Sequence, residues 1–401
     1  MQNNNPENGS SLVELAKLFL KFGVTAFGGP AAHIAMMEAE VVGRKKWLTR
    51  ERFLDLVGAV NLIPGPNSTQ LGILIGYIRA GVLGIIVSGV LFILPAVIIT
   101  GVFAWAYVRF GTLPDVSPFL SGIKPAVISI ILLAVIKMGR TAAKNMQLTI
   151  IGVAVAAASL LGANAIVALL LGGVAGIIIS SGRGNGNITT LMLSVLIVLS
   201  GWLMKIADGC ASTASAAAAR GAAAANVSLW KLGWFFLKIG SILYGSGYVL
   251  AAFIENGLVR DSGWLTQRQL LDAIAIGQFT PGPVLSTATF VGYVISGVPG
   301  AVISTIAIFL PSFVFVLILN PLLPRLMASK TMSAFLGAVN VSAVGLMAAV
   351  VIELAVSTLT DWRTIIIAAA AAVAGARFNI NAAWLIVGGA ASGWLLRQLA
   401  V

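Results

Sequence analysis

A duplicated phrase constrains the fold of this chain more than any other feature. Trp47-Leu48-Thr49 followed by Pro64-Gly65-Pro66 returns as Trp264-Leu265-Thr266 followed by Pro281-Gly282-Pro283. The two copies are 217 positions apart, and further identities continue at a spacing of 216 after a single deletion. Chance does not keep a register over such a length, so the chain consists of two related halves.

The composition indicates a protein that crosses a membrane several times. Hydrophobic residues make up 59% of the 401 positions and charged residues only 9%, against about 25% charged in an ordinary soluble domain. Apolar runs suited to membrane helices lie at Val82–Trp105, Pro118–Ile136, Leu148–Leu161, Ala165–Ser180, Ile188–Leu203, Val298–Leu319, Phe335–Ile352, Thr364–Ala374 and Ala382–Leu396. The predicted fold is therefore an all-α polytopic membrane protein with two homologous helical repeats.

The formal charge of +12 reflects membrane orientation, because the Lys and Arg residues lie in loops between apolar runs. The lipid bilayer is thus the expected partner, and nucleic acid is not. Met1 to Ser10 is polar without a basic stretch ahead of an apolar one, so we expect no cleavable signal peptide. Cys210 and His33 are the single cysteine and the single histidine. This predicts no disulfide, structural metal or cofactor, and leaves an intramembrane enzyme without a nucleophile and base.

The two halves predict three parts: a first transporter repeat over 12–183, a connecting helix and Ala-rich linker over 184–228, and a second repeat over 229–401. The extra apolar run in the linker would turn the second repeat upside down. Loop charges favour this inversion, because Gly43–Arg52 holds five basic residues and its counterpart Arg260–Gln269 holds two. We expect an inverted repeat with the basic loops of the first half inside the cell.

Glycine and proline interrupt the apolar segments at matched places. Gly28-Gly29-Pro30 breaks the first segment, and each Pro-Gly-Pro breaks a later one. We expect Asn67, Ser68 and Thr69 to cap a short helix that runs through Ile78. Backbone groups freed by such breaks must line a cavity or be buried in protein, as in many carriers with paired broken helices. Because the N-termini of such half-helices carry partial positive charge and unpaired N–H groups, an anion site is predicted there, although a single Pro-Gly-Pro could also be a simple kink.

Several polar side chains lie in or beside these apolar segments. Lys21 and Lys238 precede the breaks in the two halves, inside apolar segments where a charge is costly. Three explanations are possible: attraction of an anion, pairing with Glu38 and Glu255, or snorkelling to the interface. His33, Glu38 and Glu255 are candidates for proton handling or ion pairing. The predicted substrate-binding residues are Lys21, Gly28, Gly29, Pro30, His33, Pro64, Gly65, Pro66, Asn67, Ser68, Thr69, Lys124, Lys238, Pro281, Gly282, Pro283, Ser286 and Thr287. Small residues at Gly172, Gly176, Gly389 and Gly393 are expected to serve close helix packing.

The chain resembles the chromate ion transporter family, in its long two-domain form, at Phe27-Gly28-Gly29-Pro30, at Ala32-His33 and at the duplicated phrase. The resemblance covers both halves from about Leu12 to Ser357 and implies export of chromate across the bacterial inner membrane, with chromate resistance as the result. The family motif falls on Gly28, Gly29, Pro30, His33 and the two Pro-Gly-Pro breaks. The second half departs from it, because Gly245-Ser246-Gly247 replaces Gly-Gly-Pro.

The sequence leaves several alternatives open. The substrate could be sulfate or another oxyanion of the same shape, and a passive anion channel would need the same broken helices. A homodimer is also compatible with the sequence.

Overall fold

The computed structural model describes residues 8–27, 29–111, 117–180, 194, 197–198, 227–244, 247–319, 329–378 and 380–398. These residues form helices and connecting turns, with no strand among them. The helices of the first half are α1 (Asn8–Thr25), α2 (Gly29–Glu38), η1 (Ala39–Arg44), α3 (Arg50–Val60), α4 (Asn67–Phe110), α5 (Ser117–Ala142), α6 (Met146–Leu160) and α7 (Ala165–Ser180). The second half has α10 (Leu229–Ile242), α11 (Val249–Ile254), η2 (Glu255–Asp261), α12 (Gln267–Phe279), η3 (Val284–Ser286), α13 (Thr287–Leu319), α15 (Lys330–Thr358), α16 (Trp362–Phe378) and α17 (Ala382–Gln398).

The chain is an all-α polytopic membrane protein. Four described helices are long and apolar enough to cross a membrane, within Asn67–Phe110, Pro118–Ala142, Val284–Ile318 and Thr331–Thr358. Shorter apolar helices lie at Met146–Leu160, Ala165–Ser180 and Ala382–Leu396. Apart from residues 194 and 197–198, the predicted run at Ile188–Leu203 falls outside the described residues, as does most of the linker.

The helices gather into two compact units, and each unit combines segments of both sequence halves. Unit 1 contains Met1–Val108, Leu229–Gly247 and Ile276–Pro324, and unit 2 contains Arg109–Ser228, Tyr248–Ala275 and Arg325–Val401. The broken segments with the two Pro-Gly-Pro motifs therefore belong to unit 1. The compact units thus do not follow the division into repeats.

In unit 1, the duplication is visible in two helices that fold back on themselves. Helix α4 reverses at Gly81 (φ 60°, ψ −144°), and α13 reverses at Gly297 (φ 62°, ψ −151°), which is the matched position. A Cβ on Gly84 would collide with the carbonyl of Gly76, although eight residues span about 12 Å in a straight helix. Each reversal therefore leaves a short half-helix packed against a long helix, as the break and the short helix through Ile78 predicted.

The Trp-Leu-Thr motif starts the helix that leads to each Pro-Gly-Pro turn. Thr49 is the N-cap of α3 and its side chain accepts a hydrogen bond from the Arg52 N–H. In the second half, Thr266 and Gln269 exchange hydrogen bonds at the start of α12, which is a capping box. The threonine of the motif is thus explained by helix capping.

Aromatic side chains form the core beneath the first break in unit 1. Phe19, Phe22, Phe53 and Phe92 are almost fully buried. The ring of Phe19 meets those of Phe22 and Phe92 edge to face, with centroids 5.7 and 6.4 Å apart. This packing fixes the end of α1 against α4.

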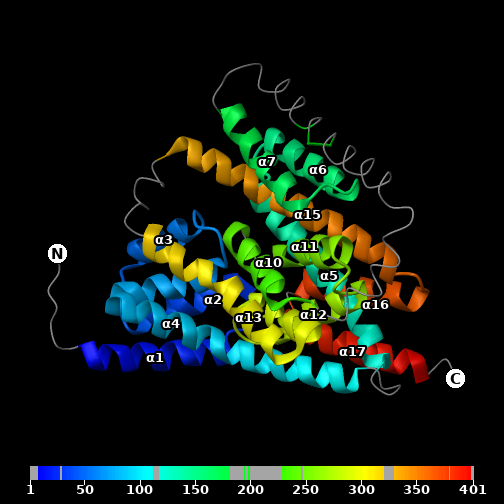
Figure 1. Ribbon diagram of the computed structural model, residues 1–401, viewed down its shortest axis with the longest axis horizontal. Helices are drawn as coiled ribbons and strands as arrows, with labels where there is room; N and C mark the ends of the chain where they lie inside the picture. The colour runs from blue at the N-terminus through cyan, green and yellow to red at the C-terminus, as the bar shows by residue number, and fades with distance from the viewer. Residues whose placement is uncertain are drawn as a thin grey trace. The chain divides into compact units, whose positions relative to one another are not determined.

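In unit 2, small residues allow helices to approach closely (Figure 1). Helices α6 and α7 pack on α15, and α5 packs with α16 and α17. A Cβ on Gly176 would lie 2.9 Å from the Ala334 carbonyl oxygen, and one on Gly393 would lie 2.7 Å from the Gly122 backbone nitrogen. Gly172 and Gly389 are equally crowded, so the predicted packing role of these four glycines is confirmed.

Candidate anion site at the broken helices

Two reciprocal backbone hydrogen bonds join the broken segments of the two halves within unit 1. The Gly65 N–H donates to the Leu243 carbonyl at 2.6 Å, and the Gly282 N–H donates to the Ala26 carbonyl at 2.9 Å. Gly282 follows Gly65 by 217 positions, and Leu243 follows Ala26 by the same number. Each Pro-Gly-Pro loop is therefore held by the helix break of the other half, in the pattern of a two-fold axis.

Both central glycines adopt backbone conformations that other residues avoid. Gly65 has φ 128° and Gly282 has φ 88°. A Cβ on Gly65 would lie 2.8 Å from the Ser312 hydroxyl and collide with the Gln70 amide, whereas one on Gly282 would lie 3.0 Å from the Ala96 Cβ. The first loop is thus the more crowded of the two.

His33 connects both loops to the first break. Its Nε2 lies 3.0 Å from the Ala26 carbonyl oxygen and its Nδ1 lies 3.2 Å from the Ser68 hydroxyl. Since a carbonyl oxygen only accepts, Nε2 carries a hydrogen, and the Nδ1 of a neutral imidazole would accept from the Ser68 hydroxyl. Ala26 therefore accepts from both His33 and Gly282.

Three buried polar atoms in or beside the first turn of α4 have no hydrogen-bond partner among the described residues. The Thr69 hydroxyl and the Gln70 Oε1 are two of these atoms, and the Ser312 hydroxyl beside Gly65 is a third. All three side chains are buried. The Gln70 Nε2 donates to the Pro64 carbonyl at 2.5 Å, so it holds the Pro-Gly-Pro loop. Hydroxyls and first-turn N–H groups together provide the donors that an anion requires.

The second loop is surrounded by hydroxyls that bond to one another. The Thr100 hydroxyl lies 3.2 Å from that of Ser286 and 3.4 Å from that of Thr280. The hydroxyl of Thr280 also donates to the Ile276 carbonyl at 2.6 Å, and that of Thr287 to the Val284 carbonyl at 2.8 Å. Here the chain forms the short η3 before α13, while α4 begins directly after Pro66.

The prediction that Asn67, Ser68 and Thr69 cap the first half-helix is wrong. Helix α4 begins at Asn67, so Pro66 takes the N-cap position and offers no side-chain acceptor. Asn67 donates to Asn61 at 2.6 Å, Ser68 bonds to His33, and the Thr69 hydroxyl has no hydrogen-bond partner within the described ranges. The three side chains are therefore not used for capping.

The alternative that Lys21 and Lys238 pair with Glu38 and Glu255 is also wrong. Lys21 donates to Glu40 at 2.6 Å, and this ammonium lowers the pKa of the Glu40 carboxyl. Glu38 pairs with Arg50 at 3.4 Å, and Glu255 with Arg260 at 3.9 Å. Gly257 stands where Glu40 would be repeated, so no ion pair of Lys238 is recorded in the part of the chain that the structure describes.

The structure brings only some of the predicted site residues together. His33, Ser68 and Gly282 share one hydrogen-bonded network, and Gly65 and Ser286 belong to the loops beside it. Gly29 (φ 78°) and Pro30 start α2 at the first break, while Gly28 lies outside the described residues. Lys124 belongs to unit 2, apart from the loops of unit 1 in the division of the chain.

Three polar residues of these loops were not predicted from the sequence: Gln70, Thr100 and Ser312. Gln70 could have been found, because a further amide directly after the polar triplet Asn67-Ser68-Thr69 is unusual in an apolar half-helix. Thr100 and Ser312 lie in long apolar runs, and a single hydroxyl there gives no sign of its neighbours. No cluster of His, Cys, Asp and Glu that could hold a metal ion occurs among the described residues.

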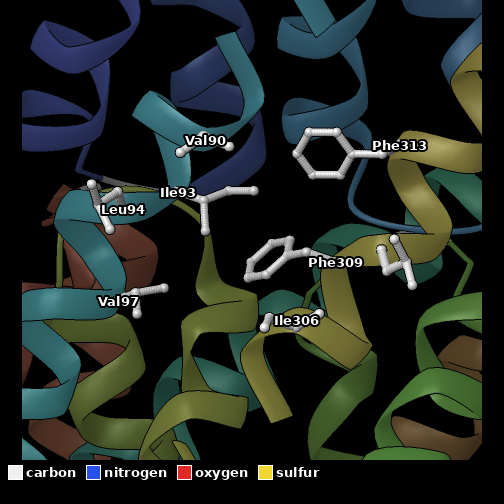
Figure 2. Close-up of a pocket in the computed structure, with 8 residues that line it drawn as sticks. Val90, Ile93, Leu94, Val97, Ile306, Phe309 and Phe313 are labelled. Atoms are coloured by element: carbon white, nitrogen blue, oxygen red, sulfur yellow. The ribbon is translucent and has the colours of Figure 1, made fainter. Parts of the chain in front are cut away.

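An apolar groove between α4 and α13 offers a contrasting surface of unit 1. Figure 2 shows Val90, Ile93 and Val97 on α4 facing Phe309 and Phe313 on α13. The groove has a volume of about 210 Å³, and all of its lining residues are apolar. It gives an anion no hydrogen-bond donor, so it fits a lipid chain and not a charged substrate.

Comparison with known proteins gives a consistent result. The family model described as Chromate transporter matches residues 13–177 and again residues 230–394, so one match falls in each half. The chain is 30% identical to the chromate transport protein of Cupriavidus metallidurans over 95% of its own length and 92% of the relative's. It is 31% identical to the chromate transport protein of Pseudomonas aeruginosa, over 96% of its own length and 92% of that relative's. No solved structure gives a significant match.

Proposed function

Because the chain belongs to the chromate transporter family, we propose that it is a secondary transporter that exports chromate across the bacterial inner membrane and so gives chromate resistance. The observation that carries this proposal is the pair of reciprocal hydrogen bonds from Gly65 and Gly282. They place two broken helices with buried hydroxyls in one compact unit, which is how carriers build a site for a small ion.

The chromate dianion would bind at the first turn of α4. The first-turn N–H groups, the Thr69 hydroxyl and the Ser312 hydroxyl supply donors, and Gln70 keeps the loop in place. Ser286 and Thr287 supply hydroxyls at the second loop. Neutral donors can hold an anion without a fixed cation, because the partial positive charge of the helix end adds to them.

Lys21, Lys238 and Lys124 remain proposed contributors to anion attraction. Both Lys21 and Lys238 are exposed in unit 1, so they would act before the ion enters the site. We further propose that the two halves insert with opposite orientation. The two-fold pattern of the loop contacts and the opposite charge bias of matched loops support this arrangement.

Export is energetically downhill for a dianion in a cell with a negative interior. Moving two charges outward releases about 4.6 kcal/mol per 100 mV. Voltage alone could therefore drive export, and uptake of the same ion would need a coupled cation. Enzymatic activity is not part of the proposal, and a homodimer stays a prediction.

The decisive experiment measures flux in proteoliposomes that contain the purified protein. Chromate, sulfate and molybdate are offered separately, with voltage and pH gradients imposed one at a time. We expect saturable chromate flux that follows the voltage. Faster transport of sulfate than of chromate at equal concentration would make sulfate the preferred substrate. A flux that never saturates would indicate a channel.

A further inference from the structure

Two glutamates of unit 2 share a single arginine. The Arg260 Nη2 contacts the Glu353 Oε1 directly, and the Arg260 Nε lies 3.9 Å from the Glu255 Oε1. The Arg260 Nη1 also lies 3.5 Å from the Ser159 carbonyl oxygen. The guanidinium therefore serves three acceptors, and Glu353 holds the shortest contact.

Both carboxylates are short of partners for a buried position. The side chain of Glu255 is 4% exposed and that of Glu353 is 16% exposed. The Oε2 of each carboxyl is buried without a hydrogen bond in the described part of the chain. With both groups ionised, the cluster carries one uncompensated negative charge, which is costly away from water.

Among the described residues, the charged groups that act on Glu255 are Arg260 of η2 and Glu353 of α15, and only Arg260 compensates its charge. Helix α7, which also packs on α11, contains no charged residue, and Ser159 at the end of α6 contributes only its carbonyl. A proton on one carboxyl removes the excess charge.

The first half has no such cluster at the matched positions. Glu38 matches Glu255, but Gly43 stands in place of Arg260 and Lys137 in place of Glu353. Glu38 pairs with Arg50 instead, and its side chain is 35% exposed. The cluster is therefore not needed to form the repeated unit.

We propose that Glu255 is a proton-binding site, at which a proton from water adds to the carboxylate while Arg260 stays bound to Glu353. Glu255 lies in η2, outside the candidate membrane spans. Burial and the nearby Glu353 charge raise the pKa of Glu255 to about 7 against the pull of Arg260, which agrees with this role. Resting on the proposed function, the same site would let a pH gradient modulate the export of chromate.

The first test needs no substrate. The thermal unfolding of the purified protein in detergent is followed from pH 4 to 9 for the wild type and for Glu255→Gln. The pKa of Glu255 is raised in the folded state, so its stabilising contribution is fully present below pH 4.5, the usual pKa of a glutamate, and is lost as the pH rises through about 7. Relative to Glu255→Gln, the unfolding temperature of the wild type should therefore fall between these two pH values.

Two variants make the test specific. Glu38→Gln, at the matched position of the first half, should follow the wild-type curve. Glu353→Gln removes the like charge beside Glu255 and leaves Glu255 as the carboxylate that pairs with Arg260. The pH at which half of the stabilisation is lost should therefore fall by about one unit or more. If Glu255→Gln does not fold, infrared titration of the carboxyl band in the wild type and in Glu353→Gln measures the same shift. Parallel curves for the wild type and Glu255→Gln, or an unmoved midpoint in Glu353→Gln, would overturn the proposal.

The second test separates proton binding from transport. At zero voltage, an imposed pH gradient should change chromate flux in the wild type and have no effect in Glu255→Gln, while chromate exchange without a gradient continues in both. If the wild type carries no chromate, the proposed function fails and the unfolding test still decides on the proton site. A Glu255→Gln protein that responds to the gradient like the wild type contradicts the link to transport.

Discussion

The two Pro-Gly-Pro regions share a backbone arrangement and differ in their side chains. Gly65 and Gly282 donate to matched carbonyls of the opposite half. Around the first loop lie His33, Ser68 and Gln70, whereas the second half has Leu250, Leu285 and Thr287 at the matched places when the spacing of 217 is continued past Pro283. Both halves thus share the loop backbone, whereas only the first half has an imidazole and a glutamine amide beside its loop. Symmetry of the fold does not imply symmetry of the chemistry.

The largest difference between the loops is expected for their central glycines. Gly65→Ala and Gly282→Ala each place a Cβ at positive φ, which costs about 1 to 3 kcal/mol. Gly65→Ala adds a clash with Gln70 and Ser312, so it should abolish most chromate transport and lower the unfolding temperature further. Flux per inserted protein and thermal unfolding measure both effects. A more damaging Gly282→Ala would reverse the comparison.

The next effect concerns the amide that holds the first loop. Gln70→Leu removes the bond to the Pro64 carbonyl and leaves this half-buried acceptor without its side-chain donor, at a cost of about 1 to 2 kcal/mol. We expect the half-saturating chromate concentration to rise about ten-fold or more, from flux measured over a range of chromate concentrations. Thr287→Val, at the matched position, is the control and should change it less. Equal changes in both variants would argue against a special role of the first loop.

His33 is expected to act as a structural donor and acceptor. His33→Ala removes hydrogen bonds to Ala26 and Ser68, and each is worth about 1 kcal/mol. The unfolding free energy should fall by about 2 kcal/mol, while the pH dependence of chromate flux stays that of the wild type. Denaturant unfolding and a pH series of flux measure the two quantities. A lost or shifted pH dependence would make His33 a proton carrier.

The smallest effect is expected for the two lysines. Lys21 is paired with Glu40, which it shares with Arg44, whereas the described residues contain no ion pair of Lys238, so Lys238 should attract the anion more. Lys238→Ala should weaken flux at low chromate concentration by a few-fold, in line with about 1 kcal/mol for an exposed charge. Lys21→Ala should weaken it less. Initial rates at low and high salt measure this, and equal losses in both variants would remove the distinction.

The sequence predicted the backbone of this region well and its contacts less well. Gly-Gly-Pro and Pro-Gly-Pro impose breaks wherever they occur, so the ends of α1 and α3 and the short half-helix of α4 followed from local chemistry. The partner of Lys21 did not follow, because Glu38 and Glu40 are close in sequence and only the turn of η1 selects between them. Ser312 and Gly65 meet through tertiary packing across the two halves, and no local pattern records such a contact.

The reciprocal loop contacts also have a consequence for the order of synthesis. The acceptor of the Gly65 N–H is Leu243, in the second half, so the first loop cannot reach its final bonding until that part of the chain has left the ribosome. At roughly 5 to 20 residues per second, the first Pro-Gly-Pro loop waits on the order of ten to forty seconds in the membrane. During that interval the freed backbone of the first half must be satisfied by water or by the insertion machinery, and a chain that ends early keeps it in that state.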